Sequence, residues 1–126
     1  MTRNALTWFE IPVADIARAQ RFYETLLAKA LRREAMGPQT LAIFPYEEGQ
    51  GVGGALLQGA TAPAPSTDGS LVYLDASPSL AVVMSRAAEL GAKVLLPALQ
   101  LPGTIGHIAQ IVDSEGNRVG LHSPNA

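Results

Sequence analysis

The sequence predicts an α+β fold in which two tandem βαβββ modules form a cleft-bearing mixed β-sheet. Three observations predict this fold. Identical residues recur at a constant offset of 65 positions, as at Arg21 and Arg86 or at Leu56 and Leu121. The two halves of the chain also show the same order of strand, helix and strand signals. A segment rich in Pro, Ala, Ser and Thr separates the halves and is typical of a linker.

The composition is that of one globular domain. A chain of 126 residues with 48% hydrophobic and 16% charged residues is long enough to bury a core without disulfides. The formal net charge of -2 and the lack of a basic stripe exclude a nucleic-acid-binding protein. No apolar run or N-terminal signal indicates a membrane protein, and the absence of Cys fits a reducing compartment, so we expect a cytoplasmic protein. We expect a single domain over 1–126, with module 1 at about 1–58, a linker at 59–69 and module 2 at about 70–126.

In the first half, a strand is predicted over 6–13, with Pro12 at a strand-end position. A helix follows, because Asp15 is a suitable N-cap and apolar residues recur at helical spacing as far as Leu27. Two strands at 30–36 and 40–46, joined by a turn at Gly37, and a third at 52–58 complete the module.

The second half repeats this order. A strand at 70–76 leads to Ser77, the predicted N-cap, and to Pro78 at the first helical position. The helix should run to Leu90, where Gly91 stops it. Three further strands are predicted over 93–98, 106–112 and 118–122.

Two segments carry a family resemblance that covers nearly the whole chain. Residues 11–16, followed by 18–23 with the Phe22-Tyr23 pair, are similar to the opening strand and helix of the vicinal oxygen chelate superfamily. Residues 113–119 are similar to its closing turn and last strand. The chain looks closest to a bacterial branch related to lactoylglutathione lyase. The resemblance implies a glyoxalase-like fold, a small-molecule ligand and a homodimer, as in bleomycin-resistance proteins.

The chain departs from this superfamily at the positions of its metal ligands. Metal-dependent members use four ligands, typically His and Glu, from the first, fourth, fifth and eighth strands. The corresponding positions hold Trp8, Ala55, Leu71 or Tyr73, and Gly120. The sequence therefore argues against a classical glyoxalase I or an extradiol dioxygenase and assigns no metal ligand. A divalent metal at a displaced site is left open.

The candidate catalytic residues are Glu10, Asp75 and His122. Because strand side chains alternate, Glu10 shares a face with Trp8, Asp75 with Tyr73, and His122 with Gly120. The repeat makes Glu10 equivalent to Asp75 and Leu57 equivalent to His122. One His and two carboxylates could serve as an acid/base set or hold a metal ion. The alternatives are that Glu10 lies on the solvent face of an edge strand, Asp75 serves the turn before the helix, and His122 is merely solvated.

The candidate ligand-binding residues are Trp8, Tyr73 and Arg118. The two aromatic side chains would stack on a flat ligand, and Arg118 shares the face of Gly120. Few other basic residues are expected in the cleft, which favours neutral or cationic ligands over anionic ones, with Arg118 as the exception.

Two functions fit these residues, and the sequence leaves open whether the chain is an enzyme. One is a lyase- or isomerase-type enzyme that lacks the usual metal ligands. The other is a non-catalytic small-molecule binding protein of the bleomycin-resistance type. A third alternative, a structural or regulatory dimer, applies if side chains fill the cleft.

Overall fold

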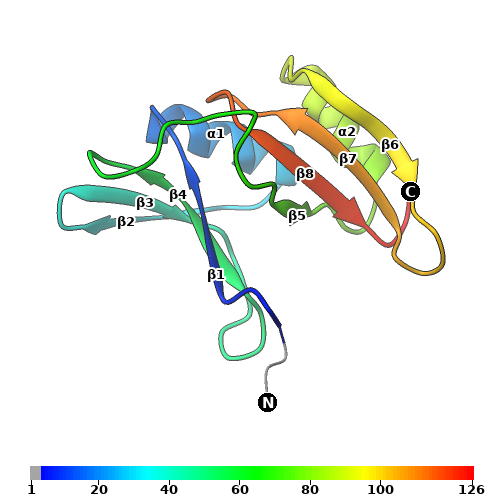
Figure 1. Cartoon of the computed structure of the whole chain (residues 1–126), viewed down its shortest axis with the longest axis horizontal. Helices are drawn as coiled ribbons and strands as arrows, with labels where there is room; N and C mark the ends of the chain where they lie inside the picture. The colour runs from blue at the N-terminus through cyan, green and yellow to red at the C-terminus, as the bar shows by residue number, and fades with distance from the viewer. Residues whose placement is uncertain (1–3) are drawn as a thin grey trace.

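The computed structural model describes residues 4–126 of the chain, and Figure 1 shows how its elements are arranged. No helix in this range is long and apolar enough to cross a membrane. In chain order the elements are β1 (Trp8–Pro12), α1 (Ile16–Leu27), β2 (Arg32–Met36), β3 (Gln39–Ile43), β4 (Gly53–Gln58), β5 (Tyr73–Asp75), α2 (Leu80–Glu89), β6 (Val94–Gln100), β7 (His107–Val112) and β8 (Arg118–Ser123).

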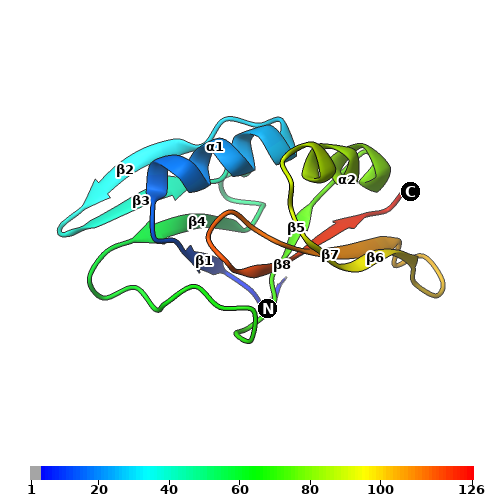
Figure 2. The ribbon, with the colours of Figure 1, turned by 90° about the horizontal axis from the view of Figure 1, so that it is seen from above.

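Each half of the chain forms its own four-stranded mixed sheet. The strand orders are β1-β4-β3-β2 and β5-β8-β7-β6. In each sheet the first strand pairs in parallel with the last, and the other pairs are antiparallel. Figure 2 shows both helices on one side of the two sheets, with the 59–72 connection running along the opposite side. The predicted α+β fold of two βαβββ modules is confirmed. The side of the sheets away from the helices is called the open face below.

Helix α1 begins and ends as the sequence predicts. The Asp15 side chain accepts a hydrogen bond from the backbone N–H of Arg18 at 3.1 Å and so caps the first turn. The helix ends at Ala28, which adopts a left-handed conformation with φ of 55°. The face buried against the sheets consists of the apolar residues at helical spacing: Ile16, Ala19, Phe22, Tyr23, Leu26 and Leu27.

Helix α2 begins two residues later than the sequence analysis predicts. Ser79, not Ser77, is the N-cap, and its hydroxyl accepts from the backbone N–H of Val82 at 3.3 Å. The backbone N–H of Ser77 instead donates to Asp75 at 2.8 Å in a turn that precedes the helix. The sequence Ser77-Pro78-Ser79 offers two hydroxyls that could cap the helix. Ser77 is engaged by Asp75 in the preceding turn, so Ser79 is left to cap the helix.

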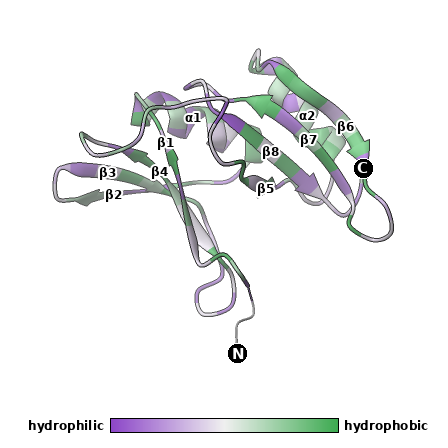
Figure 3. Ribbon diagram, viewed as in Figure 1, coloured by the Kyte–Doolittle hydropathy of each residue, from purple (hydrophilic) through white to green (hydrophobic). Residues whose placement is uncertain are grey.

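One core lies between the helices and the two sheets. Phe9 and Ile11 of β1 and Leu74 of β5 face this core, and the residues next to them in each strand face the open side. The same alternation continues in β8, where Val119 and Leu121 are buried in the core. Figure 3 shows apolar and polar stretches following one another along β7 and β8. A smaller cluster lies on the open face of the first sheet, where Ala62 covers Leu41, Ala55 and Leu57.

The two modules differ by a two-residue shift in strand register. Glu10 of β1 lies opposite Ala55, whereas Asp75 of β5 lies opposite His122. Since Leu57 lies opposite Pro12, the predicted equivalences of Glu10 with Asp75 and of Leu57 with His122 are wrong as a pair. The constant sequence offset is not kept in the strand pairing. The pairing of β5 with β8 is shifted by two residues relative to that of β1 with β4.

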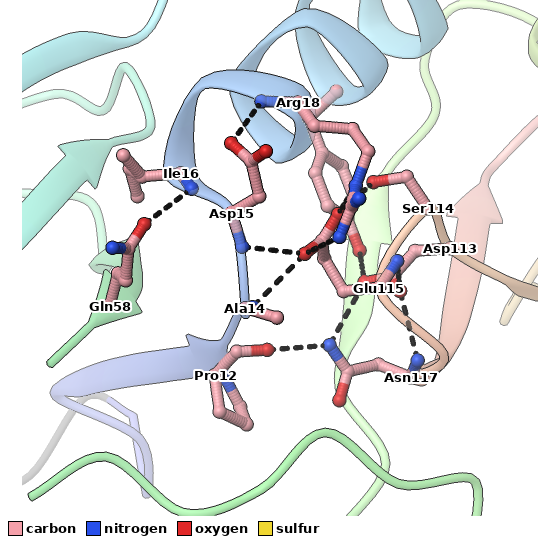
Figure 4. Close-up of polar contacts among 11 residues, drawn as sticks. Pro12, Ala14, Asp15, Ile16, Arg18, Gln58, Asp113, Ser114, Glu115 and Asn117 are labelled. Atoms are coloured by element: carbon pink, nitrogen blue, oxygen red, sulfur yellow. Dashed lines mark hydrogen bonds and ion pairs between the residues drawn. The ribbon is translucent and has the colours of Figure 1, made fainter. Parts of the chain in front are cut away.

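The turn between β7 and β8 joins the second module to the first, as Figure 4 shows. Asp113 is buried and accepts a hydrogen bond from the Tyr23 hydroxyl of α1 at 2.6 Å. It also accepts from the backbone N–H groups of Glu115 and Asn117. The Asn117 amide donates to the carbonyl of Pro12 at 2.7 Å. These contacts hold the end of β1 and the start of α1 against the second module.

Glu115 completes this contact, which we call the module clasp (Tyr23, Asp113, Glu115, Asn117 and Arg18). Its carboxylate accepts from the backbone N–H groups of Ala14 and Asp15 at 3.0 and 2.9 Å, just before α1. Arg18 donates to both carboxylate oxygens. The Arg18 hydrogen bond, with those from Asp15, Ser114 and Ala14, lowers the pKa of Glu115 to about 2 against the opposing effect of burial. Both segments that carry the family resemblance therefore meet in one contact between modules.

Candidate functional site

The open face of β1 presents Trp8 and Glu10 next to each other. The indole N–H of Trp8 donates to the Glu10 carboxylate at 3.3 Å. Trp8 is 39% exposed and packs edge-on against Tyr46, with ring centroids 6.4 Å apart. Gly53, which lies opposite Trp8 on β4, makes room for both rings, since a Cβ at this position would come within 2.9 Å of either. This end of the first sheet thus carries two half-exposed aromatic rings and one carboxylate.

The open face of the second sheet carries a chain of hydrogen bonds that ends at Tyr73. The ring of Tyr73 covers Gly120, where a Cβ would lie 2.3 Å from a ring carbon. Gln110 of β7 donates to the Tyr73 hydroxyl at 2.8 Å and accepts from Arg118 at 3.0 Å. Arg118 also donates through Nε to the carbonyl of Thr67 at 3.1 Å. The linker, Arg118, Gln110 and Tyr73 therefore form one connected network.

A pocket of about 320 Å³ lies where β1, the linker and β8 meet. Glu10 and Arg118 both line it, and Ser66 and Ser70 contribute from the linker. Its apolar lining includes Pro12, Pro63, Ile11, Val72 and Val119. The volume lies at the lower end of the range for small-molecule sites, and a mostly apolar wall with a few polar groups is typical of them. We call it the linker pocket.

A second pocket, of about 240 Å³, opens between the two modules near the end of α1. Phe9, Leu27 and Phe44 are among the apolar side chains that line it, and Lys29 and Asp75 add opposite charges. Hydrogen bonds from Ser77 lower the pKa of Asp75, and the positive charge of Lys29 lowers it further. The turn that precedes α2 therefore holds Asp75 in its ionised form. This is the structural role in the turn that the sequence offers as the alternative to catalysis.

The three candidate catalytic residues are not assembled into one site. Asp75 and His122 are paired neighbours on β5 and β8, but Glu10 lies on β1 and lines a different pocket from Asp75. The ring Nε2 of His122 lies 2.6 Å from the carbonyl of Ile105, so a loop already occupies this nitrogen. Across residues 4–126 no three His, Asp or Glu side chains are grouped so that they could hold a metal ion. The divalent metal at a displaced site stays a prediction.

The candidate ligand-binding residues are closer to one another. Arg118 and Tyr73 are joined through Gln110, and Trp8 contacts Glu10, which lines the linker pocket with Arg118. Tyr46, Gln110 and the linker residues Ser66 and Ser70 are not among the residues predicted from the sequence. Strand alternation would have placed Gln110 on the face opposite Ala109 and Ile111, both fully buried. The linker gives no such signal, since it has no periodicity.

Comparison with known proteins places the fold among glyoxalase-like proteins. Residues 5–27 match the family described as "Bleomycin resistance protein-like N-terminal". No curated protein matches the chain by sequence. A glyoxylase/bleomycin resistance protein/dioxygenase domain from Frankia sp. EAN1pec matches with a TM-score of 0.71 at 18% identity, covering 97% of this chain and 93% of that one.

Two further structures cover different shares of their own chains. TnmS3, an antibiotic binding protein from Streptomyces sp. CB03234, matches with a TM-score of 0.68 at 23% identity, covering 98% of both chains. A glyoxalase I mutant from Zea mays matches with a TM-score of 0.64 at 22% identity, covering 94% of this chain but 46% of that one. With two βαβββ modules, a matching first strand and helix, and these neighbours, the chain has the same fold as glyoxalase/bleomycin resistance protein/dioxygenase domains.

Proposed function

We propose that this chain is a small-molecule binding protein that holds its ligand in the linker pocket without chemical conversion. The observation that carries the proposal is the pocket itself, a preformed site with apolar walls and two charged side chains, Glu10 and Arg118. Trp8 lies beside Glu10, where it would stack on a flat ring of the ligand. The similarity to an antibiotic binding protein supports this class of function.

The arrangement favours binding over catalysis because its polar groups are dispersed. General acid/base catalysis needs groups within hydrogen-bond reach of the same reacting atoms. Glu10 lies on a different sheet from Asp75 and His122, and its carboxylate accepts a hydrogen bond from Trp8. A binding site, in contrast, needs only complementary walls and correctly placed charges.

The test uses Trp8, which is the single tryptophan of the chain and so makes intrinsic fluorescence specific to this site. The protein is titrated with a panel of aromatic antibiotics that includes bleomycin, and the panel members are recovered and checked for conversion by mass spectrometry. We expect saturable changes in Trp8 emission and unchanged ligand. Glu10→Gln should weaken binding of a cationic member about tenfold, or about 1.4 kcal/mol.

Glu34→Gln is the matched control, because Glu34 is an exposed carboxylate on β2 that contacts Arg32. It should bind like the parent protein. No saturable response from any panel member would refute the binding function, and conversion of a bound member would refute the absence of chemistry.

The second candidate is a lyase- or isomerase-type enzyme centred on Asp75 and His122. The observation in its favour is that these residues lie directly opposite each other on β5 and β8, both on the open face. Conversion of a panel member that is lost on His122→Gln but kept on Glu10→Gln would establish this alternative over pure binding.

We also propose that the protein acts in the cytoplasm as a homodimer. Both modules expose apolar side chains, and exposed apolar surface supports association with a second copy. These side chains are Leu6, Trp8, Tyr46, Leu71 and Tyr73. Light scattering after size-exclusion chromatography tests the assembly: Leu71→Glu should convert the dimer to a monomer, and a parent protein that is already monomeric would refute it.

A further inference from the structure

The linker pocket contains two charges that have no ion-pair partner in the described part of the chain. The Glu10 carboxylate accepts one hydrogen bond, from the indole of Trp8, and this donor is neutral. The only ion pairs across residues 4–126 are Arg18 with Glu115 and Arg32 with Glu34. Glu10 and Arg118 are therefore not paired with each other either, although both line the same pocket.

Arg118 is partly buried and is held in place by neutral acceptors alone. Its Nε donates to the carbonyl of Thr67 and its Nη1 to the side-chain oxygen of Gln110. Its backbone N–H donates to the carbonyl of Ser66 at 3.2 Å. None of these acceptors carries a charge, and no residue in 4–126 accepts from Nη2. The guanidinium is thus fixed in orientation while its positive charge remains uncompensated.

A fixed, partly desolvated guanidinium with free N–H groups is well suited to a carboxylate, which it binds through two parallel hydrogen bonds. The Glu10 carboxylate is exposed, accepts only from the Trp8 indole, and is free to bind an ammonium group. The two charges come from different sheets, β1 and β8, which the module clasp holds together through Asn117, the residue before Arg118. A ligand with a single charge would satisfy one of them and be repelled by the other.

We propose that the linker pocket selects a zwitterionic small molecule, with its cationic group at Glu10 and its carboxylate or other anionic group at Arg118. This inference rests on the proposed binding function and names the ligand class of that site. The apolar part of the molecule lies between the two charges, against Pro12, Pro63 and Val72. The sequence predicts neutral or cationic ligands, whereas this proposal requires a ligand that carries both a positive and a negative charge.

The experiment compares three matched probes on the parent protein: the zwitterionic dipeptide alanyl-phenylalanine, its N-acetyl form and its C-terminal amide. They share one apolar ring and differ in charge, since acetylation removes the cation and amidation removes the anion. Dissociation constants are measured from chemical-shift changes in ¹H–¹⁵N spectra. We expect the zwitterion to bind at least about tenfold more tightly than either single-charge form.

Two substitutions assign each charge to its residue. In Glu10→Gln the zwitterion and its N-acetyl form should bind equally, and in Arg118→Gln the zwitterion and its amide should bind equally. Glu34→Gln should leave the ranking unchanged. Because Arg118→Gln could disturb the linker, its spectrum is first compared with that of the parent; the ranking of probes on the parent and on Glu10→Gln tests the inference without it.

The outcomes separate this inference from the function on which it rests. Equal binding of all three probes, tighter binding of a single-charge form, or no binding of any probe would overturn the zwitterion requirement. If the antibiotic panel still changes Trp8 emission, the binding function stands while the ligand class is wrong. If neither the probes nor the panel bind, both proposals fail.

Discussion

The buried hydrogen bond between Tyr23 and Asp113 gives the sharpest test of how the modules are held together. Tyr23→Phe removes one hydroxyl and keeps the ring, which packs edge-on against Phe22 and Phe44 at 5.1 and 5.6 Å between centroids. A hydrogen bond to a charged group contributes about 1.5–3 kcal/mol. Asp113 retains three other donors, from Glu115 and Asn117, so it is not left unpaired. We therefore expect a loss of about 2 kcal/mol in the free energy of unfolding.

This loss is large for a chain of 126 residues. Domains of this size are stable by about 5–15 kcal/mol. With an unfolding entropy of about 2.1 cal/mol/K per residue, a loss of about 2 kcal/mol lowers Tm by about 8 °C. Urea denaturation should show a lower midpoint with an unchanged slope, because the surface exposed on unfolding stays the same.

Tyr46→Phe is the control, because Tyr46 is 39% exposed and its hydroxyl has no hydrogen-bond partner in 4–126. It should change stability by less than about 0.5 kcal/mol. Equal stability of the Tyr23→Phe and Tyr46→Phe proteins would refute the role of the buried hydroxyl.

The same bond predicts a dependence on alkaline pH. Burial, together with the Asp113 charge, raises the pKa of Tyr23 well above 10, so the folded protein keeps this proton while the unfolded chain loses it. The stabilisation is complete below pH 10 and is lost as pH rises from there towards the raised folded pKa. Above pH 10 the parent should lose stability more steeply than Tyr23→Phe, and parallel curves would contradict this assignment.

The remaining predictions concern the clasp and the open face. For Glu115→Gln, the loss of stability on acidification between about pH 4.5 and about pH 2 should be shallower than in the parent, because the folded carboxylate has a pKa of about 2; acid titration followed by circular dichroism measures it. Asn117→Ala should cost about 2–4 kcal/mol in urea denaturation, since it leaves a carbonyl of β1 and an amide of the linker without partners. Gly120→Ala should cost about 1–3 kcal/mol in the same assay by displacing the Tyr73 ring, whereas Gly69→Ala, with nothing within 4 Å, should not.

The sequence predicts the fold well because local signals and the repeat point to the same answer. The alternation of apolar residues along the strands places Phe9 and Ile11 in the core and Glu10 outside it, as the structure shows. Asp15 caps α1 as expected. The errors arise where two local solutions compete, as at Ser77 and Ser79, or where pairing between strands decides the register.

The candidate site is predicted less well, because it depends on which edges of the two sheets lie together. Alternation gives the correct face for Glu10, Asp75, Arg118 and His122. It does not say that Glu10 and Arg118 share a pocket while Asp75 lies in another. That arrangement follows from the turn at 113–117, where the Asn117 amide binds the carbonyl of Pro12 at the end of β1, and no pattern in either strand contains this information.

The two segments that resemble the vicinal oxygen chelate superfamily in sequence contain the residues that hold the modules together. Tyr23, Asp113, Glu115 and Asn117 are directed towards one another, and of these only Asn117 also borders the linker pocket. Pro12 and Arg118 of the same segments line the linker pocket, so these segments also contribute to the proposed ligand site. The other groups that would contact a ligand are Glu10 on the open face and the linker residues Pro63, Ser66 and Ser70. Exchanging linker residues 63–70 should change which molecules bind while leaving the clasp, and with it the stability of the fold, nearly intact.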